Sequence, residues 1–418
     1  MGDLALFVAA RAALAAIALG TTFAGGAVAQ PVHDRNGKTS GLRLGAHGTL
    51  LGTYATPVLG GEAASEAYLT RPVLTALFVG ANGRLRASGT LNLEGWTLVD
   101  GELNAGMWGE GFVDRRHPHT FLHELVATGA ISLAGIDASL TVGRGFAPFG
   151  TDDPMVRPFV KYPVNHHLAQ ILERWVGIVA LRRGPVIVEA GAFNGDEPTS
   201  PESLGEVDRF GDSWALRATV LPLAGVEVQA SRAYVESPEH VGGRGLDHRK
   251  WSASARYEPG LGDFAAYALL EWARTDEYAD GRRLYAFGTW LVEGALGRDR
   301  WRFAARWERS TRPEEERLLD PFRTVRPHHD DNINGATRWV TWTARAERSV
   351  TVGGLSVTPF AEASRITVAE IAGGIFSPTD FYGDEKLWSL SLGARIGVGS
   401  VHDRMGRYGL AAPGGTHH

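Results

Sequence analysis

Hydrophobic and polar residues alternate with a period of two along many segments of the chain. Between residues 84 and 96, Leu85, Leu91 and Leu93 share one parity with alanine and glycine. Arg84 and Arg86 share the other parity with Ser, Thr, Asn and Glu. The pattern recurs in residues 251–258, 301–308 and 388–398. Because successive side chains of a β-strand point to opposite faces, these segments are predicted to be strands with one apolar and one polar face.

The same reading predicts about 16 strands, which is a number typical of large membrane barrels. They span residues 42–55, 68–79, 84–97, 120–134, 136–146, 172–183, 185–194, 212–222, 225–236, 249–259, 262–274, 283–296, 299–310, 336–348, 355–367 and 387–398. Short glycine-rich connections alternate with long ones. The prediction is therefore an all-β fold, an antiparallel transmembrane β-barrel with short periplasmic turns and long extracellular loops.

Strand length bears on the choice between a membrane barrel and a soluble β protein. The predicted strands are longer than the usual five or six residues of globular proteins. Tryptophan and tyrosine lie towards strand ends, as in an interfacial aromatic girdle. An exported soluble β protein that binds carbohydrate or protein remains an alternative, because alternation alone does not say which face is inside.

Composition and the N-terminal residues place the chain in the cell envelope. An apolar stretch followed by Ala27-Val28-Ala29 predicts a signal peptide over residues 1–29. A short periplasmic segment at 30–41, a barrel at 42–398 and a C-terminal tail at 399–418 are expected to follow. The sequence has no cysteine and a formal net charge of −5, which excludes disulfides and argues against a nucleic-acid partner. The expected location is the outer membrane of a Gram-negative bacterium.

A short motif adds a family resemblance. Residues 143–150 read G-R-G-F-A-P-F-G and are similar to a segment of phosphate-selective and related porins. The whole mature chain resembles bacterial outer-membrane porins of the sixteen-strand type. This resemblance implies passive diffusion of small hydrophilic solutes or ions, a loop at 147–171 that folds inward and narrows the channel, and a homo-trimer in outer-membrane lipid. No nucleophile motif is present, so no enzyme activity is expected.

The polar face of each strand is expected to line the channel, and its charges are candidate pore-lining residues. The candidates on the wall and in loop 147–171 are Arg84, Arg86, Glu94, Arg256, Glu258, Arg302, Arg306, Glu308, Arg395, Asp152, Asp153, Arg157 and Lys161. Like charges in rings or ladders would select ions by sign. Alternatively, these charges pair across strands and only keep the wall polar.

Histidines clustered near two predicted loops suggest a second role. His117, His119, His166 and His167 are candidate ligands for a divalent metal such as zinc, copper or nickel. A metal-associated outer-membrane barrel is therefore an alternative function, and no other cofactor is expected. The sequence His123-Glu124 begins like the H-E-x-x-H motif, but it lacks the second histidine and lies on a predicted strand.

Overall fold

The computed structural model describes most of the chain. The described residues are 32–33, 39–98, 101–103, 115–116, 119–164, 166–239, 242–261, 264–315, 333–372, 377–399 and 404–412. The predicted signal peptide and His117 lie outside the described residues.

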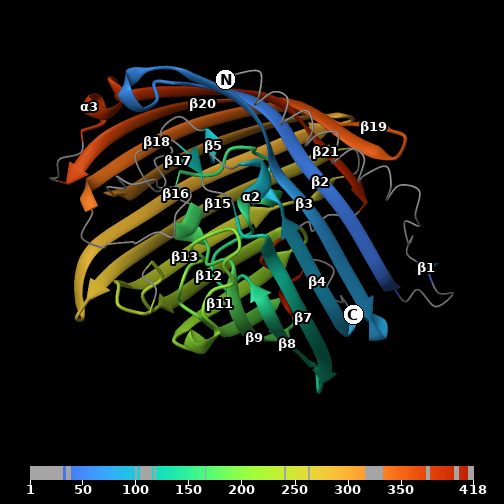
Figure 1. The fold of residues 1–418 in the computed structure, drawn as a ribbon. Coiled ribbons are helices and arrows are strands. Elements are labelled where there is room, and N and C mark those ends of the chain that lie inside the picture. The colour runs from blue at the N-terminus through green and yellow to red at the C-terminus, as the bar shows by residue number, and fades with distance from the viewer. Residues whose placement is uncertain are drawn as a thin grey trace.

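Sixteen long strands of the described chain form one closed antiparallel barrel (Figure 1). They are β2 (Thr39–Thr56), β3 (Ala64–Gly80), β4 (Leu85–Asn92), β7 (Leu122–Leu133), β8 (Ile136–Gly145), β9 (Arg174–Arg183), β10 (Val186–Phe193), β11 (Ser213–Leu223), β12 (Val226–Val235), β13 (Asp247–Tyr257), β15 (Phe264–Ala279), β16 (Arg282–Arg298), β17 (Trp301–Glu315), β18 (Ile333–Arg348), β20 (Leu355–Ala372) and β21 (Lys386–Gly399). Each strand pairs with the next, and β2 pairs with β21 to close the sheet. Figure 1 shows the blue β2 beside β21 at this seam. The predicted fold class is confirmed.

Shorter elements extend or connect these strands. The short strands are β1 (Val32–His33), β5 (Glu102–Leu103), β6 (Arg115–Arg116), β14 (Gly260–Leu261) and β19 (Val350–Val352). The helical turns are α2 (Glu94–Thr97), α3 (Pro378–Tyr382), η1 (Leu59–Gly61), η2 (Ala81–Gly83), η3 (Pro154–Val156), η4 (His166–Ala169), η5 (Val207–Arg209) and η6 (Gly409–Ala411). None of the helices in the described parts of the chain has the length and apolar character needed to cross a membrane.

The orientation of the faces distinguishes this barrel from a soluble one. On β7, Leu125 is 55% exposed on the outside, while Glu124 and Val126 are buried on the inside. On β11, Leu216 is exposed and Arg217 is buried. An apolar outer face around a polar interior is the pattern of a transmembrane barrel, and it is the reverse of a soluble β fold.

Several predicted strand boundaries differ from the structure, and two of the differences have clear local reasons. The strand predicted over 84–97 ends at Asn92, because Glu94 caps the neighbouring strand by accepting hydrogen bonds from Thr70 Oγ1 and Arg71 N, both 2.9 Å. The loop predicted over 275–282 is a tight turn between β15 and β16. Asp280 (φ 49°) and Gly281 (φ 76°) both adopt left-handed backbone conformations, as a two-residue type I′ hairpin requires.

Candidate functional site: the lumen of the barrel

Residues 146–173, between β8 and β9, extend into the lumen. Val160 N and Lys161 N donate hydrogen bonds to the Glu362 carboxylate on β20, at 2.8 and 2.9 Å. Val164 N donates to Glu308 Oε2 on β17 at 3.2 Å. Strands β17 and β20 lie on the opposite side of the sixteen-strand order from β8 and β9. The segment therefore crosses the lumen from one wall to the other, and we call residues 146–173 the lumen segment.

Arg157 and Lys161 of the lumen segment are buried and form ion pairs, one with a wall strand and one with the short strand β5. Arg157 Nη2 lies 2.9 Å from Glu271 Oε2 on β15. Lys161 Nζ lies 2.8 Å from Glu102 Oε1 and donates to the backbone carbonyl of Leu103 at 2.9 Å. Buried charges that are paired in this way fix the position of the segment, and their electric fields on a solute in the lumen partly cancel.

Asp152 is the centre of the densest charge network. Arg404 Nε lies 2.6 Å from Asp152 Oδ2, Arg407 Nε lies 3.6 Å from Oδ1, and Arg256 forms a further ion pair with the same carboxylate. Burial alone would raise the pKa of Asp152, but Arg404, Arg256 and Arg407 outweigh burial and hold that pKa well below its ordinary value. The carboxylate is therefore charged at neutral pH, and it joins the lumen segment, β13 and the C-terminal residues.

Residues 404–412 lie inside the barrel beside β7 and β8, and we call them the C-terminal segment. Tyr408 donates a hydrogen bond from its hydroxyl to Glu124 Oε2 at 2.9 Å and accepts one from Phe146 N at 3.0 Å. Met405 packs in the buried apolar cluster that also contains Phe146. The C-terminal segment thus packs against the start of the lumen segment and against β7. Alternation gave no signal for it, because it is not a strand.

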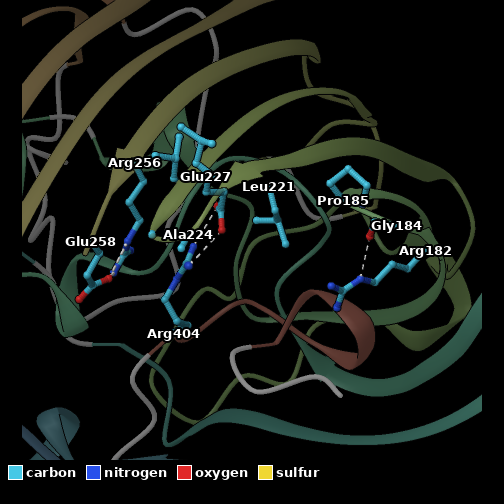
Figure 2. Close-up of a pocket in the computed structure, with 12 residues that line it drawn as sticks. Arg182, Gly184, Pro185, Leu221, Ala224, Glu227, Arg256, Glu258 and Arg404 are labelled. Carbon is cyan, nitrogen blue, oxygen red and sulfur yellow. Dashed lines mark hydrogen bonds and ion pairs between the residues drawn. The ribbon is translucent and has the colours of Figure 1, made fainter. Parts of the chain in front are cut away.

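Arg404 of the C-terminal segment lines a pocket of about 530 Å³ near the short turns of β9–β10 and β11–β12. Figure 2 shows Arg404 reaching Glu227 and Arg256 reaching Glu258 at this pocket. Arg404 Nη2 is 3.0 Å from Glu227 Oε1, and Arg256 Nη2 is 2.6 Å from Glu258 Oε2. The pocket is lined by both positive and negative side chains.

The remaining pore-lining candidates fall into three groups. Arg306 and Glu308 anchor the lumen segment, since Arg306 Nη1 donates to Lys161 O at 2.9 Å. Glu94 is fully buried and accepts hydrogen bonds from Thr70 Oγ1 and Arg71 N on β3. Arg84, Arg86, Arg302 and Arg395 are exposed or half-buried. Arg302 forms one ion pair, at 3.9 Å to Glu347.

The candidate metal histidines do not all come together. The ring centroids of His119 and His166 are 6.3 Å apart. His167 makes an edge-to-face contact with His166, with 4.3 Å between ring centroids, but its Nδ1 lies 3.7 Å from Glu197 at a more exposed position. His123, which was not among the candidates, lies closer to His119, at 4.9 Å between ring centroids. Burial lowers the pKa of His119 although Glu173 acts in the opposite direction.

The closed sixteen-stranded barrel, the polar lumen and the inserted lumen segment define a porin-type architecture. No protein-family model matches the chain, and no curated protein matches it. Among solved structures, in-vitro folded OmpT, an outer membrane protein of Vibrio cholerae in trimer form, is similar over 86% of this chain and 99% of its own, with 10% identity and a TM-score of 0.46.

Two further similar structures come from Pseudomonas aeruginosa. OccK10 (OpdN) matches 87% of this chain and 99% of its own, with 11% identity and a TM-score of 0.41. OpdK, solved with vanillate, matches 86% of this chain and 99% of its own, with 10% identity and a TM-score of 0.40. At these low identities and TM-scores, the description of the fold rests on the strand pairing of this chain.

Proposed function

We propose that this protein is an outer-membrane channel for passive diffusion of small hydrophilic solutes or ions, narrowed by residues 147–171. The observation that supports this most is the lumen segment itself. It crosses a polar interior and is held by wall residues on β15, β17 and β20. A channel needs such a constriction to be fixed in place, because its width sets the size limit. Outer-membrane lipid and a homo-trimer complete the proposed setting, and no catalytic step is assigned.

We further propose that the channel prefers anions. Several carboxylates that face the lumen already have arginine partners, as in the Glu189–Arg217 pair at 2.6 Å. Elsewhere on the inner face of the barrel, Arg43 on β2 and Arg395 on β21 form no ion pair with any described residue. An excess of like charge along one side of a pore favours ions of the opposite sign. The net field should therefore be positive.

Planar-bilayer conductance of the refolded mature chain tests both proposals. Stable ohmic steps are expected, with a reversal potential in a salt gradient that indicates anion preference. The double variant R43E/R395E should move that reversal potential towards cations. The matched control is Arg282→Glu, since Arg282 is exposed at the turn between β15 and β16 and should have no effect.

Two results would contradict these proposals. A barrel that shows heat-modifiable gel migration but no conductance would overturn the diffusion channel. If R43E/R395E conducts with an unchanged reversal potential, the channel proposal stands and the proposal that these arginines cause an anion preference is overturned.

A further inference from the structure

Two histidines and two carboxylates meet where the lumen segment rejoins the wall. His119 lies three residues before the start of β7, His123 is on β7, and Glu173 is the last residue before β9. Asp153 comes from the start of the lumen segment. All four are buried, with at most 4% of each residue exposed. The cluster therefore links both ends of the lumen segment to the barrel wall.

The distances within this cluster suit a small cation. His123 Nδ1 lies 2.8 Å and His119 Nδ1 lies 3.6 Å from the same oxygen, Oε1 of Glu173. His119, His123 and Glu173 each offer one ligand atom, and these atoms lie within 4.8 Å of one another. Ligands of one tetrahedral zinc ion, at about 2.0–2.2 Å from the metal, are roughly 3.4 Å apart. The 2.8 Å contact between His123 and Glu173 is a hydrogen bond in the structure, and a bound ion would take its place.

The second nitrogen of His123 has the partner that metal-bound histidines use. Its Nε2 faces Asp153 Oδ2 at 3.6 Å. Neither atom has a hydrogen bond within the described part of the chain, although both are buried. A carboxylate that accepts a hydrogen bond from the far ring nitrogen fixes the orientation of a metal-bound histidine. When Nδ1 is coordinated, Nε2 must carry the proton, which would favour this hydrogen bond.

We propose that His119, His123 and Glu173 bind one divalent transition-metal ion of the zinc type, with Asp153 as the residue that positions His123. Two imidazoles and one carboxylate form a common three-residue ligand set for such ions, with a further position left for water. The bound ion would connect the start of β7 to Glu173, the last residue of the lumen segment. It also compensates two buried carboxylates, which are costly to bury without cations.

This site differs from the one expected from sequence. His119 is common to both, but His123 and Glu173 take the places that His117, His166 and His167 had in the prediction. His167 is thus a matched control, because it lies in the same segment and belongs to a separate contact with Glu197.

The test is zinc binding by the full mature barrel. The protein is stripped with a chelator and refolded with or without zinc, and in a parallel sample zinc is added after folding. Bound metal is then measured by elemental analysis and by competition with a chromophoric chelator. One zinc per barrel is expected in the wild type and in His167→Ala. Glu173→Gln and His123→Ala should lose it, and Asp153→Asn should weaken it by about 10–100-fold.

Heat-modifiable gel migration confirms that each variant is folded, and Glu173→Gln preserves side-chain shape if His123→Ala does not fold. Cobalt in place of zinc gives an independent measurement on the wild type, since a four-coordinate site has intense visible absorption. The proposal is overturned if the wild type binds no zinc by either route, or if Glu173→Gln and Asp153→Asn bind it as the wild type does. Loss of zinc in His167→Ala alone would also overturn it. None of these results depends on channel conductance.

Discussion

The ion-pair network around Asp152 predicts that replacing this carboxylate with an uncharged side chain will release the C-terminal segment. Asp152→Asn keeps the side-chain shape and removes the charge that Arg256, Arg404 and Arg407 share. Asp152 itself is 1% exposed, so solvent cannot replace the lost carboxylate. The expected result is a C-terminal segment that leaves the lumen for a measurable fraction of time, while the sixteen-stranded barrel stays folded.

The size of the loss in docking free energy depends on which ion pairs the arginines retain in the variant. Breaking a buried ion pair by removing one partner costs about 3–5 kcal/mol. Arg404 retains Glu227 at 3.0 Å, and Arg256 retains Glu258 at 2.6 Å. We therefore expect the lower end, about 3 kcal/mol of docking free energy. That corresponds to a roughly 100-fold rise in the undocked population.

Trypsin reports this population directly, because Arg404 and Arg407 are themselves cleavage sites. When opening is fast relative to cleavage, the cleavage rate tracks the open fraction, so Asp152→Asn should release C-terminal peptides about 100-fold faster. Single-channel conductance should rise in the same variant. The control is Asp208→Asn, an exposed carboxylate in η5. Equal cleavage rates in Asp152→Asn and the wild type would refute the assignment of Asp152 as the residue that docks this segment.

Two further predictions concern acid and lipid. Because the folded pKa of Asp152 is lowered, its contribution is complete above the unfolded pKa of about 4 and is lost only as pH falls through the lower folded value. Hydrogen-exchange protection of residues 404–412, corrected for intrinsic rates, should thus be constant from neutral pH to about 4, and loss of protection at higher pH would contradict this. Leu270→Arg, on the outer face of β15, should lower the unfolding free energy by about 2–4 kcal/mol in lipid, against about 0–1 for Leu284→Arg at a strand end. Equal costs in urea unfolding would show that Leu270 does not face lipid.

The strands were predictable because every residue of a barrel strand faces either lipid or the polar interior. A strand between lipid and water must alternate along its length, so the pattern from Trp388 to Val398 was enough to find β21. Alternation failed at Glu94, where the parity continues although the strand has ended at Asn92. The side chain there is polar because it accepts hydrogen bonds from β3, and a period-two pattern does not distinguish that role from a pore-lining one.

The interior was less predictable because its partners are distant in sequence. Lys161 pairs with Glu102, 59 positions away, Arg157 with Glu271, 114 away, and Asp152 with Arg404, 252 away. In sequence, these residues are indistinguishable from charges on a solvated loop. Only their shared burial in the lumen shows that they hold the lumen segment and the C-terminal segment in place.

This pairing also explains why charge counting does not give the ion preference. A polar wall that must hold an inserted, charged segment needs arginines and carboxylates in nearly equal numbers, because each buried charge requires a partner. Pairs such as Arg217–Glu189 and Arg345–Glu362 therefore add nothing to the net charge, and their electric fields in the lumen largely cancel. The field that a passing ion meets is set by the few charges left over. In the described wall these include Arg43 and Arg395, so the proposed anion preference rests on individual residues and not on the overall charge of the sequence.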